Sequence, residues 1–267
     1  MFKNYFKTFI EGLKGYGKAT KFISKNKLSY FYLFPLLLNL LLFLLGVKMV
    51  DYFTDEINGY ISTLLFSESN NNSLWYGFLN SVVYWTVWVV SKIVYIYLFA
   101  LVGGYFTIII LSPVFTFLSE KTAEIITGVK TKFQLKQLVK DILRAVIIAF
   151  RNMIIQLFFS ILFLITSLIP IIGWIISIVG NFLLSSYFYG FAFMDYSNER
   201  NKLSLRESVH FVRENKGFAT GLGSIFSLCF FIPVIGGALA SFLAIICVVN
   251  ATIKVEEEII EEAKLIV

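Results

Sequence analysis

The sequence Ile169-Pro170-Ile171-Ile172-Gly173 interrupts a run of 43 residues, from Asn152 to Met194, that contains no charged side chain. A helix needs about 20 apolar residues to cross the ~30 Å hydrocarbon core of a bilayer, so this run is too long for one crossing. It must fold back at the proline. A turn among lipid headgroups is normally polar, whereas this turn is apolar. The pattern therefore predicts a helical hairpin whose turn lies buried in the membrane.

A second stretch has the same pattern. Residues Phe218 to Ile253 are also uncharged, and they are broken at Ile232-Pro233-Val234-Ile235-Gly236-Gly237. Each hairpin arm is expected to have about 16 to 23 residues, which suits either a helix that crosses the bilayer or a re-entrant helix that inserts partway. Both arrangements remain open.

The composition places the whole chain in a membrane. Hydrophobic residues make up 58% of the sequence, charged residues only 15%, and the mean hydropathy is +0.78. We therefore expect an all-α integral membrane protein with one membrane domain over residues 1–267. The net charge of +6 comes from lysine and arginine blocks beside apolar segments. Such blocks indicate contact with anionic lipid in the bilayer, and no nucleic-acid partner is expected.

The charge pattern also predicts a topology. Long transmembrane helices are expected over Leu28–Val47 and within Leu74–Ser119, and the first is expected to be an uncleaved anchor. Seven lysines precede the first helix with a single acid, Glu11, and acids dominate after it. Both termini are therefore expected in the cytoplasm, as in a multi-pass protein of the inner (plasma) membrane.

Two basic amphipathic helices are expected at the membrane interface. One covers the N-terminal residues, and the other follows a capping box at Thr131-Lys132-Phe133-Gln134 and carries Lys132, Lys136, Lys140 and Arg144 on one side. A second capping box, Ser204-Leu205-Arg206-Glu207, predicts another cytoplasmic helix start. Anchoring to headgroups is the favoured role for the basic helices, and a substrate vestibule is the alternative.

The sequence does not predict an enzyme. His210 is the only histidine, and it is remote in sequence from Cys229 and Cys247, so neither a metal site nor a catalytic triad can be assembled. No phosphate-binding glycine motif is present. No catalytic residues, metals or cofactors are expected.

Binding of an anion has better physical support. Each hairpin turn would direct the amino end of its second arm, with its unpaired amides and positive dipole, into the membrane interior. Gly173, Gly236 and Gly237 would let an ion approach the backbone closely. The alternative is that these residues only make tight turns. Ser112-Pro113 is a third expected helix start, with Ser112 as the cap.

Polar residues within the apolar segments have two interpretations. They either form interhelical hydrogen bonds, which we favour, or line a wet path for an ion. These residues are Asn39, Asn181 and Asn250, with Gln156.

Several segments, in their order along the chain, resemble the CysZ-like sulfate permeases of bacterial inner membranes, the family that includes etoposide-induced protein. They are Pro35-Leu36-Leu37-Leu38-Asn39, Ser112-Pro113, Leu118-Ser119-Glu120-Lys121, Ile169 to Gly173, Asp195-Tyr196, Asn201-Lys202, Gly221-Leu222-Gly223, Ile232-Pro233 and Asn250-Ala251-Thr252. The resemblance implies a homo-oligomer in which each subunit has two long transmembrane helices and two partly inserted helical hairpins. It also implies uptake of sulfate.

One family motif differs in this chain. The sulfate permeases carry Gly-Leu/Ile-Arg-Arg, which is associated with sulfate binding, where this chain has Lys27-Leu28-Ser29-Tyr30. Lys25, Lys27 and Ser29 are therefore the candidate anion-binding residues at this position, although lysine lacks the forked donors of arginine.

Two functions are thus expected. The first is a permease or channel-like protein for a small inorganic anion such as sulfate. The alternative is a membrane scaffold or lipid-interacting protein of the same fold that does not transport. A permease should gather the three asparagines and the hairpin amides around a wet path, whereas a scaffold should bury them as separate helix contacts.

Overall fold

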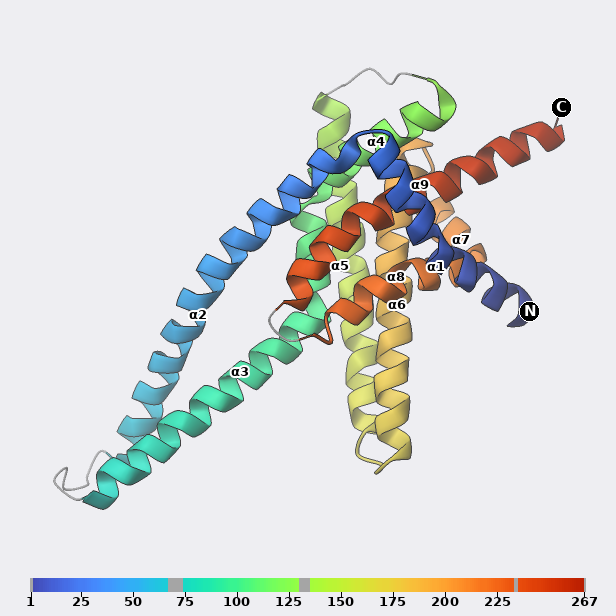
Figure 1. Cartoon of the computed structure of the whole chain (residues 1–267). Coiled ribbons are helices and arrows are strands. Elements are labelled where there is room, and N and C mark those ends of the chain that lie inside the picture. Colours follow the sequence, from blue (N-terminus) through green and yellow to red (C-terminus); the bar gives the residue numbers. More distant parts are fainter. Residues whose placement is uncertain (1, 67–73, 130–134, 233–234, 267) are drawn as a thin grey trace.

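The computed structural model describes residues 2–66, 74–129, 135–232 and 235–266, and every regular element within these ranges is helical (Figure 1). In chain order the elements are α1 (Phe2–Lys25), the 3-10 helix η1 (Leu28–Tyr32), α2 (Leu33–Phe66), α3 (Leu74–Ile110), α4 (Ser112–Thr127), α5 (Leu135–Thr166), α6 (Ile172–Arg200), α7 (Leu205–Glu214), α8 (Lys216–Cys229) and α9 (Gly236–Ile266).

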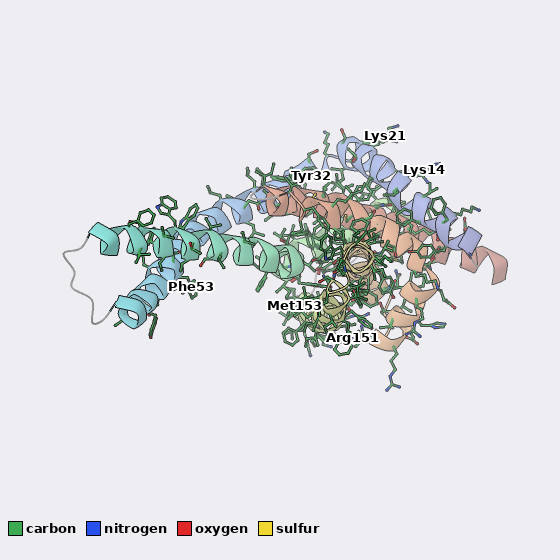
Figure 2. The ribbon with its side chains drawn as sticks, turned by 90° about the horizontal axis from the view of Figure 1, so that it is seen from below. Lys14, Lys21, Tyr32, Phe53, Arg151 and Met153 are labelled. Atoms are coloured by element: carbon green, nitrogen blue, oxygen red, sulfur yellow. The ribbon has the colours of Figure 1, made fainter. Side chains whose placement is uncertain are left out.

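Helices α2 and α3 form a long arm that projects away from the rest of the protein, as Figures 1 and 2 show from two directions. They have 34 and 37 residues, so they are about 50 and about 55 Å long at 1.5 Å per residue. The predicted end of the first long helix, at Val47, is too early, because α2 continues past Lys48 and Asp51. In the described residues, the helices that are long and apolar enough to cross a membrane are Val139–Thr166, Ile172–Arg200 and Gly236–Glu261.

Helices α5 and α6 pack side by side and are joined by the first proline turn. The Ile172 amide donates to the Pro170 carbonyl (2.8 Å), and Ile171 has φ 65° and ψ −67°, a strained γ-turn conformation for a β-branched residue. A Cβ on Gly173 would lie 1.8 Å from the Thr166 carbonyl oxygen, so the turn needs glycine there.

The protein itself does not bury this turn. Leu168 is 81% exposed and Ile171 is 68% exposed on the surface of the chain. Apolar side chains this exposed at the end of a hairpin require a cover outside the chain, either lipid or another subunit.

The second hairpin differs from the first. Its arms, α8 and α9, have 14 and 31 residues, so the expectation of arms of about 16 to 23 residues is wrong here. Helix α8 is buried along almost its whole length because α1, α6 and α9 pack around it. It therefore forms part of the protein core. Pro233 and Val234, in the turn, lie outside the described residues.

Small residues allow α6 and α8 to pack closely. A Cβ on Gly190 would lie 1.8 Å from the Ala219 carbonyl oxygen, and a Cβ on Gly223 would lie 1.9 Å from that of Ser186. Aromatic rings fill the space beside this contact. Phe226 lies between Phe193 and Tyr189, with ring centroids 5.1 and 4.9 Å away.

The predicted helix starts have mixed outcomes. The capping box at Ser204 is confirmed, because the Glu207 amide donates to the Ser204 hydroxyl and the Ser204 amide donates to the Glu207 carboxylate. The box at Thr131 lies outside the described residues. At Ser112-Pro113 the predicted helix start is confirmed, because α4 begins at Ser112 with the proline in its first turn. The predicted cap is wrong: the cap is Leu111, and the Ser112 hydroxyl donates to the Ile109 carbonyl (2.8 Å).

The second basic helix is not a separate element. Its described residues form the first turns of α5, which continues to Thr166, and Lys136 and Lys140 are exposed. Arg144 was expected on the basic side. It instead binds Asp195 of α6, because burial of an arginine between helices requires a carboxylate partner.

Candidate functional site

Three buried hydroxyl groups meet where α4, α6 and α9 pack together. Ser197 Oγ donates to Thr252 Oγ1 (3.0 Å), and Ser119 Oγ lies 3.1 Å from Thr252 Oγ1 and 3.3 Å from Ser197 Oγ. All three side chains are almost completely buried. We call Ser119, Ser197 and Thr252 the hydroxyl triad.

Arg200 lies directly beside the hydroxyl triad. Its Nη1 donates to the Ser119 carbonyl (2.7 Å) and to the Ser119 hydroxyl (2.9 Å), and its Nη2 donates to the Glu256 carboxylate. The Asn201 side chain donates to the same carboxylate oxygen of Glu256 (2.9 Å). The guanidinium group is therefore mostly buried (the Arg200 side chain is 13% exposed), contacts one hydroxyl of the triad, and is neutralised by a carboxylate from α9.

A second ion pair extends this polar region toward α5 and α7. Arg144 donates to both carboxylate oxygens of Asp195, from Nη2 to Oδ1 (2.8 Å) and from Nε to Oδ2 (3.1 Å). The Ser208 hydroxyl of α7 also donates to Asp195. Five helices, α4 to α7 and α9, are thus tied together by polar contacts at the end of α6 that is far from its proline turn.

Glu120, next to the triad residue Ser119, lies in this region and is half-buried. Burial raises the pKa of the Glu120 carboxyl above its ordinary value, and the negative charge of Asp141 raises it further. The positive charges of Arg200 and Lys121 act in the opposite direction.

The donors of this site suit an oxyanion. A guanidinium group presents planar, paired donors, and hydroxyl groups add donors that can rotate, so together they match the oxygens of a tetrahedral anion. In this structure the Glu256 carboxylate accepts from Nη2 of the guanidinium, at the place where an anion would bind. Among the described residues no group of histidine, cysteine, aspartate and glutamate is arranged to hold a metal ion.

The residues expected to bind an anion lie elsewhere. Lys25 ends α1, Lys27 has a left-handed backbone conformation (φ 58°), and Ser29 lies in η1; all three are exposed. Their segment, the junction between α1 and α2, lies at the opposite end of the protein from the α5–α6 turn in Figure 1. The lysines and the Gly173 turn are therefore not brought into one site.

The hairpin glycines make tight turns. The Gly173 amide donates to the Ile169 carbonyl, and the Gly236 amide donates to the Ile232 carbonyl, both at 3.0 Å. A Cβ on Gly236 would lie 1.9 Å from the Cys229 carbonyl oxygen. Gly237 is buried in the first turn of α9. To bind an anion, the Gly173 and Gly236 amides would have to leave these carbonyls.

The three asparagines form separate contacts between helices. Asn39 donates to Ser241 of α9 (2.6 Å), Asn181 accepts from Ser160 of α5 (2.6 Å), and Asn250 donates to the Gly12 carbonyl of α1 (3.0 Å). Each bond joins a different pair of helices. Gln156 likewise connects α5 to α3 and α6, accepting from Tyr105 and donating to Ser185.

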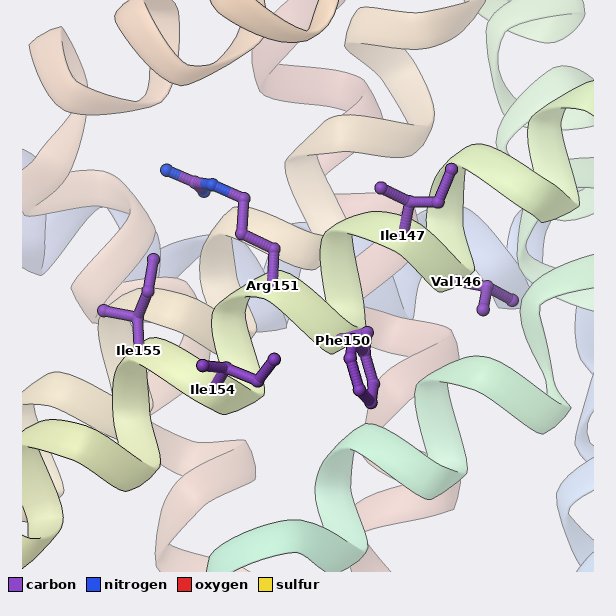
Figure 3. A pocket seen from close by; sticks show the side chains of 6 residues that line it. All are labelled: Val146, Ile147, Phe150, Arg151, Ile154 and Ile155. Atoms are coloured by element: carbon purple, nitrogen blue, oxygen red, sulfur yellow. The ribbon is translucent and has the colours of Figure 1, made fainter.

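An open groove of about 500 Å³ lies on the outer side of α5 (Figure 3). Its lining is apolar apart from Arg151, which donates to the side chain of the adjacent Asn152 (3.1 Å). The exposed Ile147, Phe150 and Ile154 make this surface suitable for lipid chains or another subunit, and unsuitable as an anion site.

Ser197, Arg200 and Glu256 were not predicted as site residues. Two signals pointed toward them. Four segments that carry the family resemblance, around Ser119, Asp195, Asn201 and Thr252, contribute to this polar region. In addition, Arg200 and Glu256 each lie just beyond an uncharged run.

The sequence matches the model of a known protein family. No curated protein matches the sequence. A family model, described as Sulfate transporter CysZ/Etoposide-induced protein 2.4, matches residues 16–240, which is most of the chain and includes Ser119, Ser197 and Arg200. The apolar helices agree with a membrane location. The chain therefore belongs to the Sulfate transporter CysZ/Etoposide-induced protein 2.4 family.

Proposed function

We propose that this protein is a membrane permease for a small inorganic oxyanion, with sulfate as the first candidate. The family match over residues 16–240 carries the proposal, because its description names a sulfate transporter. The mostly buried guanidinium of Arg200, which donates to one of three clustered hydroxyls, supports it, since these donors suit a tetrahedral oxyanion.

Arg200 and the hydroxyl triad are the proposed anion contacts. In the described structure Glu256 neutralises Arg200, so a passing anion would replace the Glu256 carboxylate on Nη2. Lys25, Lys27 and Ser29 are proposed to attract the anion at the surface, because they stand where the family carries its arginine motif. Gly173, Gly236 and Gly237 remain secondary candidates.

We also propose the setting of this activity. The chain forms one membrane domain of the inner (plasma) membrane, with both termini in the cytoplasm, as the lysine-rich N-terminus favours. The two hairpins are partly inserted, and the subunits form a homo-oligomer. The exposed apolar turn at Ile171 and the apolar groove on α5 support covering by lipid or by another subunit.

Uptake of labelled sulfate into proteoliposomes tests the proposal. Vesicles containing the protein should accumulate sulfate faster than empty vesicles, and thiosulfate and selenate should compete because they are also tetrahedral dianions. Chloride should compete weakly, because a single spherical ion cannot use the paired donors of arginine. Equal accumulation in protein-containing and empty vesicles for every anion would refute the permease.

A second candidate function is a membrane scaffold that does not transport. The observation in its favour is that Asn39, Asn181 and Asn250 each join a different pair of helices, as expected for structural contacts. The absence of flux for all anions, from a protein that remains folded in the vesicles, is the result that would support it.

A further inference from the structure

The lysines of α1 form a single stripe along the helix. Lys7, Lys14, Lys18, Lys21 and Lys25 are separated by seven, four, three and four residues. At 3.6 residues per turn they fall within a sector of about 60° and cover a length of about 27 Å. All five side chains are exposed. We call these five residues the lysine stripe.

The opposite side of α1 is fixed to the protein. Gly12, Gly15, Tyr16, Ala19 and Ile23 are buried, and their side of the helix packs on α8 and α9. A Cβ on Gly12 would lie 2.6 Å from the Phe218 carbonyl oxygen, so the helix is too close to α8 to rotate. The lysine stripe therefore has to face away from the protein, and Figure 2 shows Lys14 and Lys21 at the outer edge of α1.

No carboxylate in the described part of the chain forms a salt bridge with the lysine stripe. The one acid of α1, Glu11, binds Lys254 (2.8 Å) on the protein side. Lysines spaced three and four residues apart repel one another, so the stripe favours an external partner with several negative charges.

The position of α1 in the chain indicates which partner this is. Three residues after Lys25 the chain enters η1 and then α2, where Leu33, Leu36, Leu37 and Leu40 are exposed. Exposed leucines at the start of a long apolar helix suit contact with lipid chains, which would place the charged residues just before them at headgroup depth.

We propose that the lysine stripe is a binding surface for anionic phospholipid headgroups of the adjacent leaflet. It holds α1 flat on the membrane and thereby sets the position of α8 and α9, on which α1 packs. This role does not depend on transport and applies equally to a permease and to a scaffold.

Lipids that copurify with the full-length protein test this proposal. The protein is reconstituted in a mixture of phosphatidylcholine with a minority of phosphatidylglycerol, extracted with its surrounding lipid, and the ratio of the two lipids is measured. The variant K7Q/K14Q/K18Q/K21Q is compared with K202Q/R206Q/R213Q/K216Q, which removes the same charge from exposed positions of the α6–α8 connection. Lys25 is left unchanged because of its proposed role in attracting the anion.

The wild type and the connection variant should both retain phosphatidylglycerol above its bulk proportion. In the stripe variant the ratio of phosphatidylglycerol to phosphatidylcholine should fall at least about tenfold, since each lysine near an anionic surface raises the affinity for it roughly fivefold. Its unfolding temperature should not fall, because the stripe makes no ion pair among the described residues. Equal enrichment in the two variants would overturn the proposal. Displacement of phosphatidylglycerol by sulfate, but not by chloride at the same ionic strength, would also overturn it by identifying a site for free anions.

Discussion

Arg200 binds Ser119 twice through one nitrogen, since Nη1 lies 2.7 Å from the Ser119 carbonyl oxygen and 2.9 Å from its hydroxyl oxygen. This contact ties α6 to α4, and the bond from Nη2 to Glu256 adds α9. Three helices are thus joined through one guanidinium group. Substitutions of Arg200 and Glu256 should reveal whether these residues form an anion site or only a structural contact.

Glu256→Gln should make the protein dependent on an added oxyanion. The substitution leaves the Arg200 charge buried without a carboxylate, which costs about 3 to 5 kcal/mol in soluble proteins. Sodium sulfate should then raise the unfolding temperature of this variant more than sodium chloride at equal ionic strength. The double variant R200Q/E256Q should show no difference between the salts. If both variants respond alike, sulfate does not replace Glu256 at Arg200.

Gly190→Ala should destabilise the contact between α6 and α8. The new methyl group would lie 1.8 Å from the Ala219 carbonyl oxygen, so the helices must separate, at a cost of about 1 to 3 kcal/mol. The control is Gly17→Ala, at an exposed position of α1 where nothing lies within 4 Å of the added Cβ. There alanine should raise the free energy of unfolding by up to about 1 kcal/mol, because it favours the helix more than glycine does. Thermal unfolding in detergent compares the two, and similar shifts would contradict the close packing described here.

Glu120→Gln should stabilise the protein at neutral pH but not in acid. Because burial raises the pKa of Glu120, the folded state holds its proton more tightly than the unfolded state. The stability linked to this proton is complete below the ordinary glutamate pKa and is lost as the pH rises through the raised value. The unfolding temperature of the variant should therefore exceed that of the wild type increasingly from acid to neutral pH. Glu257→Gln, at an exposed position, is the control. If the difference in unfolding temperature between Glu120→Gln and the wild type stays constant from acid to neutral pH, the prediction is wrong.

Lys25→Gln combined with Lys27→Gln should weaken sulfate uptake at low ionic strength. Two exposed positive charges at the α1–α2 junction attract anions over about 10 Å at 0.1 M salt, and higher salt screens them. The variant should therefore have a lower rate and a flatter dependence on salt than the wild type. A matched change of Lys202 and Lys216 to Gln, both also exposed, should have a smaller effect. Unchanged uptake in the first variant would remove these lysines from the anion path.

Local features of the fold were readable from the sequence because they depend on neighbouring residues. The break at Pro170 follows from the ring and from the length of the uncharged run, and the capping box at Ser204 needs only residues three apart. Charged residues were a less reliable guide to where a helix ends. Helix α2 continues past Asp51, and α5 carries Lys136 and Lys140 within the same helix as its apolar part.

The candidate site could not be assembled from the sequence because its contacts join distant segments. Ser119 and Ser197 are 78 residues apart, and Arg200 and Glu256 are 56 apart. Which side chains meet depends on how each helix is rotated when it packs, and the apolar pattern of a membrane helix does not specify this rotation. Arg144 shows the difficulty: its spacing matched a basic surface, yet it binds Asp195 between α5 and α6.

Sulfate uptake by proteoliposomes containing Arg200→Lys, compared with Arg213→Lys, decides whether the Arg200 guanidinium contacts the transported anion. Lysine keeps the positive charge but cannot donate to Ser119 and to a second oxygen in the planar geometry of arginine. Arg213 is exposed on α7 and serves as the matched control. We expect that the wild type and Arg213→Lys take up sulfate at similar rates and that Arg200→Lys is at least about tenfold slower, a difference of about 1.4 kcal/mol in activation free energy. Equal rates for the two variants, in protein that is equally folded, would contradict this expectation.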